Sequence, residues 1–204
     1  MKWEDWYSVR EVKTVSFWRD IFSEFLVSSF LLLYVTLSMV VLDSSIYHVD
    51  MVYIGILVGF LVFVLIEGYG PVSSFMNPST CLAQCLVGRI SIVRALISML
   101  SESAGGIAGS FLVYQVVVVG LVYRLTPDQL KSQIHPFVPS NLITPWQGMI
   151  VEMILSFNLL YITLSSTDNR THDVILPSLT ISFTIGIGIM AAVSVYLLLS
   201  MEIL

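Results

Sequence analysis

Charged side chains are scarce in this sequence: Asp, Glu, Lys and Arg make up 11% of its 204 residues. A soluble domain usually carries about a quarter, so the chain lacks the polar side chains that a water-facing surface of its size requires. This scarcity excludes a soluble globular enzyme, and an apolar content of 56% excludes a disordered chain. Lys and Arg number only nine against 14 Asp and Glu, and they form no basic stripe. Their scarcity argues against nucleic acid as a partner.

Cysteine is also rare. Cys81 and Cys85 are the only two, and they lie four positions apart within one apolar stretch. A metal site would need more ligands, so we predict no metal, no cofactor and no structural disulfide. No nucleophile and base are expected at the same depth in a membrane, where they could act together, so we predict no catalytic residues.

Long apolar runs are abundant instead, and the mean hydropathy is +0.89. A membrane-spanning helix needs roughly 20 mostly apolar residues. Five stretches qualify, at about residues 17–42, 50–66, 92–123, 146–165 and 174–200. They predict an all-α, multi-pass membrane protein in which residues 17–204 form the transmembrane domain and residues 1–16 precede it.

The basic residues predict the orientation of these spans. With the N-terminus in the cytoplasm, seven Lys and Arg residues lie inside and two outside, as the positive-inside rule favours. The inside set is Lys2, Arg10, Lys13, Arg19, Arg89, Arg94 and Arg170, and the outside set is Arg124 and Lys131. Five spans then place the C-terminus outside.

A short apolar segment between the second and third spans differs from the rest. Asn77 and Pro78 open it, since Asn is a good N-cap and Pro suits the first helical position, and Gly88 closes it. Its length of about 10 residues corresponds to roughly 15 Å of helix, half of the hydrocarbon thickness. We therefore predict a re-entrant half-helix over about residues 77–88, shielded by its neighbours. The alternative is an ordinary turn followed by a helix.

Three acidic residues, Glu24, Glu102 and Glu152, lie inside predicted spans. Ionisable groups there usually face the interior of a helix bundle, where these carboxylates could fix the backbone amides of broken helices. A protonated carboxyl or a misplaced span boundary are the alternatives.

An internal repeat is visible between the first and fourth spans. Glu24 to Ser28 and Glu152 to Ser156 share the spacing Glu-x3-Ser at an offset of 128. The spacing predicts an inverted repeat. The alternative is a coincidental likeness of two apolar helices.

Small residues recur at a spacing of four in two of the spans. Gly55 and Gly59 show it in the second span, and Gly105 and Gly109 show it in the third. Such spacing lets helix backbones approach closely, so it predicts a compact bundle.

Taken together, these segments resemble the aquaporin family over about residues 17 to 195. The resemblance rests on several motifs, none of which is specific alone. They are Phe17-Trp18-Arg19 with Glu24-Phe25-Leu26, Met76-Asn77-Pro78-Ser79, Ile90 to Leu96, and Glu152 with Thr167-Asp168-Asn169-Arg170. The family implies six spans and two half-helices that meet at two Asn residues, tetramers with one pore per subunit, and passage of water, glycerol or other small neutral solutes.

The sequence departs from the family pattern at several points. Ser79 stands where Ala is usual in the Asn-Pro-Ala box, and the second box, its half-helix and the sixth span have no counterpart. The resemblance places Leu57 near the usual aromatic residue of the pore filter and Gly188 near the usual His, which implies a wider filter. Gly188 could equally be a packing glycine. We therefore expect a C-terminally shortened aquaporin fold.

Three hypotheses for function follow. The first is a passive channel for water and small neutral solutes, in which Asn77, Pro78, Ser79, Leu57 and Gly188 line the pore. Glu24 and Glu152 would brace the half-helix loops. The second is a non-conducting subunit that pairs with other membrane proteins. The third and weakest is a membrane-embedded enzyme.

Overall fold

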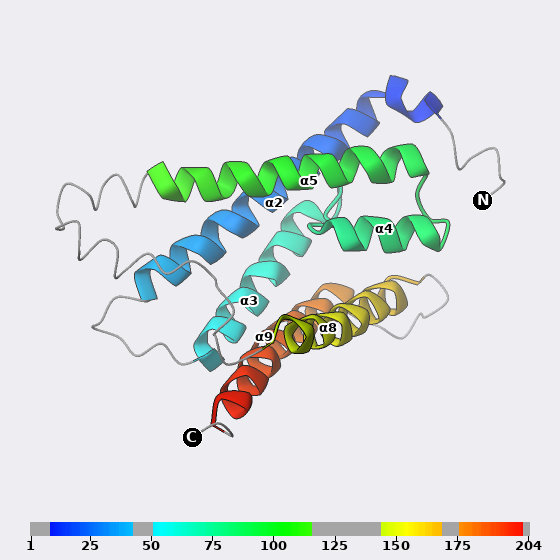
Figure 1. Ribbon diagram of the computed structural model, residues 1–204. Helices are drawn as coiled ribbons and strands as arrows, with labels where there is room; N and C mark the ends of the chain where they lie inside the picture. Colours follow the sequence, from blue (N-terminus) through cyan, green and yellow to red (C-terminus); the bar gives the residue numbers. More distant parts are fainter. Residues whose placement is uncertain (1–8, 43–50, 116–143, 169–175, 202–204) are drawn as a thin grey trace. The chain divides into compact units, whose positions relative to one another are not determined.

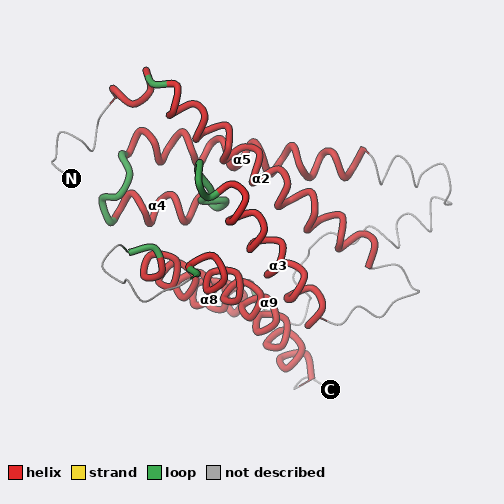
Figure 2. The backbone as a smooth tube through the Cα atoms, turned by 180° about the vertical axis from the view of Figure 1, so that it is seen from behind, coloured by secondary structure: helices red, strands yellow, loops and turns green. Residues whose placement is uncertain are grey.

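The computed structural model describes residues 9–42, 51–115, 144–168 and 176–201, and every regular element among them is a helix (Figures 1 and 2). These elements are η1 (Val9–Lys13), α2 (Val15–Leu42), α3 (Met51–Tyr69), α4 (Pro78–Leu86), α5 (Ile92–Val113), α8 (Pro145–Ser166) and α9 (Pro177–Met201). The prediction of an all-α chain is confirmed for the described residues. Residues 1–8 of the predicted N-terminal segment lie outside them.

Three of these helices are long and apolar enough to cross a membrane. They are Val15–Ser38 in α2, Ile92–Val113 in α5 and Trp146–Ser166 in α8. Helices α3 and α9 contain shorter apolar stretches, Tyr53–Tyr69 and Pro177–Ala191, within the described residues. The predicted third span, residues 92–123, runs past the part of α5 that the structure describes, whereas the bounds of the other four predicted spans agree with helices to within three residues.

The helices group into two compact units, and among the described residues the chain passes from one unit to the other inside α2 and inside α3. The first unit contains η1, α2 up to Leu37, the end of α3 from Val64, α4 and α5. The second unit contains the remainder of α2, α3 up to Phe63, α8 and α9. In both views α4 runs beside α5, and α8 runs beside α9 (Figures 1 and 2).

Close backbone contact joins α2 to α5 in the first unit. A Cβ atom on Gly105 would lie 2.3 Å from the carbonyl oxygen of Phe25, and one on Gly109 would lie 2.1 Å from that of Ser29. No side chain fits at such distances, so these two glycines allow the helices to pack. The predicted role of the small residues in α5 is therefore confirmed.

Arg94 ties the start of the first unit to α5. Its Nε donates to Glu11 at 2.8 Å, and its Nη1 donates to Asp20 at 2.9 Å. The guanidinium also lies over the ring of Phe17, 5.1 Å from the ring centroid, and Phe17 is fully buried. A delocalised cation suits both contacts, so one side chain holds η1 and α2 against α5.

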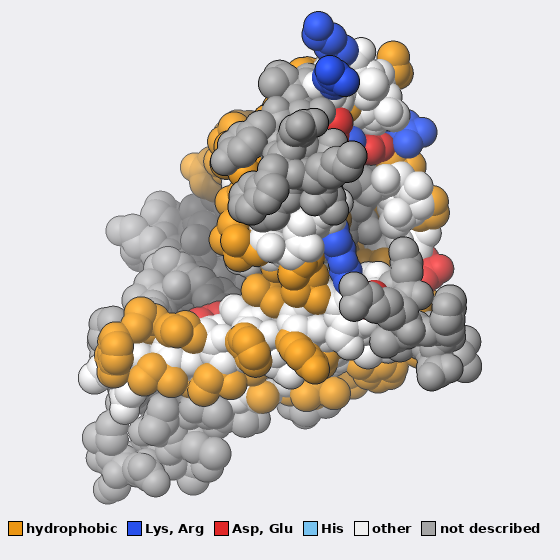
Figure 3. Space-filling model, turned by 90° about the vertical axis from the view of Figure 1, so that its right-hand side faces the viewer, with side chains coloured by type: hydrophobic (Ala, Val, Ile, Leu, Met, Phe, Trp, Pro, Cys, Tyr) orange, Lys and Arg blue, Asp and Glu red, His pale blue; other side chains and the backbone are white. Residues whose placement is uncertain are grey.

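Large apolar side chains are exposed along the long helices. Leu100 on α5 and Phe157 on α8 are each 72% exposed, and Phe60 on α3 is 66% exposed. Figure 3 shows hydrophobic side chains spread across the face in view. Such surface would be unfavourable in water but suits contact with lipid chains.

Candidate functional site

The candidate site begins at the N-terminus of α4. Asn77 has an extended backbone, with φ −147° and ψ 126°, and its Oδ1 accepts a hydrogen bond from Ser79 N at 2.9 Å. Pro78 occupies the first helical position, where a missing N–H costs nothing. Because capping uses Oδ1, the hydrogen-bond donor that remains on the Asn77 side chain is Nδ2. Asn77 and Ser79 are both exposed, and Pro78 is partly buried.

Helix α4 is short and ends at a glycine. It has nine residues, which at 1.5 Å per residue is about 14 Å, roughly half of a hydrocarbon core. Gly88 follows it with a φ of 73°, a left-handed conformation that favours glycine. The inner face of α4 is buried through Thr80, Cys81, Ala83, Gln84 and Cys85.

Glu24 on α2 holds the segment that leads into α4. Its carboxylate accepts hydrogen bonds from Phe75 N at 2.9 and 3.0 Å, from Met76 N at 3.2 Å and from the hydroxyl of Ser73. Ser23 next to it donates to the carbonyl oxygen of Ser73 at 2.8 Å. Glu24 is fully buried, so these backbone donors stand in for the water that the carboxylate loses.

Met76 sits in a conformation that L-residues rarely adopt. Its φ is 59°, and it is the one non-glycine residue with a positive φ among those the structure describes. The left-handed region costs a residue with a Cβ about 1–2 kcal/mol. The hydrogen bonds of Glu24 to Phe75 N and Met76 N offset this cost, so Glu24 helps fix the direction in which Asn77 enters α4.

A second carboxyl approaches α4 from α5. Glu102 is 3% exposed, and its Oε1 accepts a hydrogen bond from the thiol of Cys81 at 3.3 Å. Its Oε2 is buried and has no hydrogen-bond partner in the described part of the chain. Glu102 therefore faces the protein interior.

The other predicted site residues belong to the second unit. Leu57 on α3 and Gly188 on α9 are partly buried, and a Cβ atom on Gly188 would meet only Leu155 Cδ2, at 4.0 Å. Glu152 on α8 is exposed, and none of the described residues hydrogen-bonds to its side chain. Within the described residues, Glu152 therefore holds no backbone amide in the way that Glu24 does.

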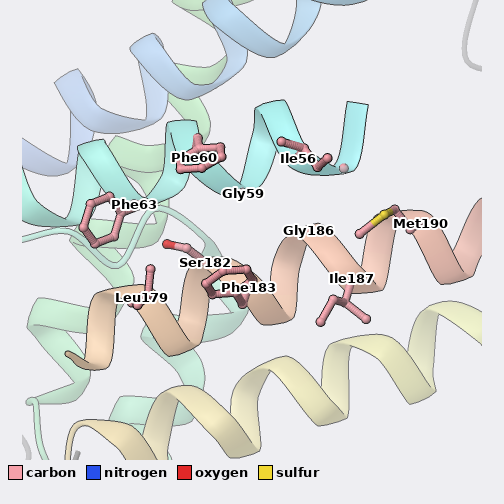
Figure 4. Close-up of a pocket in the computed structure, with 11 residues that line it drawn as sticks. Ile56, Gly59, Phe60, Phe63, Leu179, Ser182, Phe183, Gly186, Ile187 and Met190 are labelled. Carbon is pink, nitrogen blue, oxygen red and sulfur yellow. The ribbon is translucent and has the colours of Figure 1, made fainter. Parts of the chain in front are cut away.

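An apolar groove lies between α3 and α9 in the second unit (Figure 4). Gly59 and Gly186 face each other across it, and Phe60, Phe63 and Phe183 are among its lining residues. Its single lining hydroxyl, that of Ser182, donates to the carbonyl oxygen of Ser178 at 2.6 Å. The groove thus offers no free donor to a polar solute, and it lacks Leu57 and Gly188.

The structure brings together part of the predicted set. Four predicted residues meet at the start of α4: Glu24, Asn77, Pro78 and Ser79. The other three, Leu57, Glu152 and Gly188, lie in the second unit. Sequence reasoning missed Ser73, and it named Met76 only as part of a motif, without its backbone conformation. The signal for Ser73 is the short linker from Gly70 to Asn77, because a linker that must turn back toward α2 needs polar anchors.

The start of α4 presents donors rather than metal ligands. Among the described residues, no group of three His, Cys, Asp or Glu side chains could hold a metal ion. The first-turn N–H groups of α4 are paired within the helix cap, since Ser79 N donates to Asn77 Oδ1 and both Thr80 N and Cys81 N donate to Asn77 O. The helix dipole still places partial positive charge at this end, which disfavours a cation, and Asn77 Nδ2 can donate to a neutral molecule that accepts hydrogen bonds.

The sequence of this chain is similar to those of known proteins. Residues 11–197 match the profile described as "Major intrinsic protein". The chain belongs to the major intrinsic protein family. Major intrinsic proteins are channels and not enzymes, so the predicted resemblance to aquaporins and the predicted lack of enzymatic activity are both confirmed. Membership also identifies the chain as a membrane protein.

Aquaporins are among the curated relatives of this major intrinsic protein. It is 30% identical over 181 residues to "Aquaporin-5" of Mus musculus, a match that covers 88% of this chain and 64% of the relative. It is 29% identical over 181 residues to "Aquaporin-5" of Homo sapiens, with the same coverage. It is 27% identical over 193 residues to "Aquaporin-4" of Homo sapiens, covering 90% of this chain and 55% of the relative. The chain thus spans less than two thirds of the length of these relatives.

Proposed function

We propose that this chain forms a passive membrane channel for water, and that it admits glycerol or other small neutral solutes. The observation that carries the proposal is the start of α4, where the exposed Asn77 caps the helix through Oδ1 and keeps Nδ2 as its side-chain donor. A water molecule that accepts this bond is oriented, and a single file of water so oriented relays protons poorly. The relatives named aquaporin support the same solute.

The charge at this point favours neutral solutes over cations. The N-terminal N–H groups of α4 contribute partial positive charge, and no acidic side chain is hydrogen-bonded to the Asn77 side chain in the described residues. Pro78 and Ser79 complete the tip of the helix. Glu24 positions it by holding Phe75 and Met76, and we assign the corresponding brace in the second unit to Glu152.

Leu57 and Gly188 would set the width of the passage. Neither side chain offers a ring, and glycine leaves open space on α9. A filter bounded by such groups would be wide and weakly polar, which favours passage of glycerol as well as water. The tetramer of the family, with one pore per subunit and the N-terminus in the cytoplasm, belongs to the same proposal.

Osmotic swelling of vesicles tests the proposal. The full chain is reconstituted into liposomes, and stopped-flow light scattering measures water permeability after a step in sucrose concentration and glycerol permeability after a step in glycerol. Proteolysis from one side checks insertion, and cross-linking measures the oligomeric state. We expect both permeabilities to exceed those of empty liposomes.

A correctly inserted chain whose liposomes swell no faster than empty ones would contradict conduction. That result would favour the second candidate, a non-conducting membrane subunit. The exposed apolar side chains on α8, such as Phe157, would then be available to a partner helix.

A further inference from the structure

Two carboxyl groups from different helices reach the first turn of α4. Helices α2 and α5 touch on either side of them: Ser101 Oγ donates to the carbonyl oxygen of Ile21 at 2.8 Å, and Gly105 packs on Phe25. Glu24 lies between those two contacts on α2, and Glu102 lies between them on α5. The packing of the helices therefore sets the two carboxyls against each other.

Both carboxyls are cut off from water, but only one is well supplied with donors. Glu24 is fully buried, and both of its oxygens accept backbone N–H bonds from Phe75 and Met76. Glu102 accepts from the Cys81 thiol on Oε1 and also interacts with the backbone N–H of Asn77, whereas its Oε2 has no hydrogen-bond partner in the described chain. An ionised Glu102 would thus be a buried charge with less compensation than Glu24.

The groups that face Glu102 offer no positive side chain. From α2 it faces the carboxyl of Glu24, from α4 the thiol of Cys81, and from the start of α4 the backbone of Asn77. No Lys or Arg of the described residues hydrogen-bonds to either carboxyl. Arg94, the nearest in sequence on α5, is already paired with Glu11 and Asp20.

We propose that Glu24 and Glu102 form a proton-binding site, in which one proton is held on Oε2 of Glu102 and shared with Glu24. Two like charges in one desolvated site are strongly disfavoured, so a buried Glu102 beside a second carboxyl retains its proton. The backbone donors stabilise the ionised form of Glu24, which assigns the proton to Glu102. The protonated Oε2 then becomes a donor, and the unpaired buried atom is satisfied.

The proton would link three elements. Glu24 holds the linker before Asn77, Glu102 holds Cys81 in the first turn of α4, and the shared proton joins the two carboxyls. Removal of the proton would leave two adjacent negative charges behind the start of α4. The site is a property of the first unit alone, so it does not depend on whether the chain conducts.

Infrared spectroscopy of the full chain in liposomes tests the site directly. A protonated carboxyl gives a C=O stretching band that is separate from the band of a carboxylate. We expect such a band at neutral pH, its loss on raising the pH, and its absence in Glu102→Gln at neutral and alkaline pH, where the exposed carboxyls are ionised. The glutamine amide supplies the donor that the proton supplied, so this variant should keep its helix content.

The exposed Glu67 on α3 provides a matched control, because Glu67→Gln should leave the band unchanged. The S–H stretching band gives a second readout, since the Cys81 thiol donates to Glu102, and Cys81→Ala identifies its contribution. This band should shift as the carboxyl band disappears. Absence of a protonated carboxyl at neutral pH, its survival in Glu102→Gln, or its loss without a thiol shift would each overturn the proposal.

Discussion

Asn77 caps α4 with its side-chain oxygen and, in the proposed channel, would donate to the solute from its side-chain nitrogen. Its oxygen is committed to Ser79 N, so the helix itself determines which way the amide NH2 points. An aspartate is as good an N-cap as asparagine, and a negative charge is favourable at this end of a helix. Asn77→Asp should therefore preserve the fold while replacing the free donor with an acceptor.

We expect Asn77→Asp to lower water permeability by about 2- to 10-fold, which corresponds to the loss of one hydrogen bond of about 0.5–1.5 kcal/mol, and to raise proton or cation leak. Stopped-flow swelling and a pH-sensitive dye in the same liposomes measure both. Leu86→Ala is the control, because Leu86 lies exposed at the opposite end of α4 and belongs to no part of the candidate site. An unchanged permeability and leak in a conducting wild-type background would remove Asn77 from the pore.

The positive φ of Met76 makes a separate prediction at the same turn. Valine is β-branched and tolerates the left-handed region poorly, whereas glycine adopts it freely. Met76→Val should lower stability by about 1–3 kcal/mol, and Met76→Gly should lower it less or not at all. Thermal unfolding in detergent, followed by circular dichroism, compares them. Equal loss in the two variants would show that side-chain packing at Met76 matters more than backbone conformation.

At the scale of helices, packing depends on where the glycines are. Gly109 leaves no room for a Cβ, which would lie 2.1 Å from the Ser29 carbonyl, whereas a Cβ on Gly106 would meet Leu32 Cγ at an ordinary 3.6 Å. Gly109→Ala should therefore destabilise the α2–α5 pair by about 1–3 kcal/mol through overpacking. Gly106→Ala should be neutral or slightly stabilising because alanine favours helix.

Thermal unfolding and the monodispersity of the detergent-solubilised chain distinguish these two variants. The pair is closely matched, since both substitutions add one methyl group to the same helix three positions apart. If Gly109→Ala were as stable as Gly106→Ala, the close approach of α2 and α5 would not be needed for folding.

The starts of helices could be predicted from the sequence because their signals are local. Asn77 and Pro78 mark the start of α4, and the pattern is read within three residues. The Thr144-Pro145 pair starts α8 in the same way, with Gln147 completing a capping box. Such caps fix where the chain becomes helical, and apolar length indicates which helices can span.

Tertiary partners could not be predicted in this way. Glu24 and Phe75 are 51 positions apart, and nothing near either residue specifies the other. Glu102 and Glu152 are both acidic residues within apolar helices, yet one is buried against Cys81 and the other is exposed. The difference arises because one helix face packs against a neighbour and another does not. In a helix that is apolar on all sides, the periodicity of the sequence does not indicate which face is buried.

At the scale of the whole molecule, polarity is inverted relative to a soluble domain. The first unit buries Ser23, Glu24, Ser28, Ser98 and Glu102, while large apolar side chains are exposed. In a bilayer the surrounding lipid provides no hydrogen bonds, so polar groups gather inside, where other protein groups can bond to them. This inversion is what a passage for polar solutes requires, because the lining must hydrogen-bond while the outside must not.

Gly188 gives the prediction that tests the width of such a passage. The open space beside it means that a larger residue can be introduced without the clash expected at Gly186, where a Cβ would lie 2.8 Å from the Gly55 carbonyl. Gly188→His should narrow the filter and reduce glycerol permeability more than water permeability, since glycerol is the wider solute. Gly188→Ala, which adds only a methyl group, should change the ratio little. The two permeabilities are measured by swelling in parallel, with thermal stability as a check on folding. A ratio that is the same in Gly188→His and wild type would mean that Gly188 lies away from the passage and serves only in helix packing.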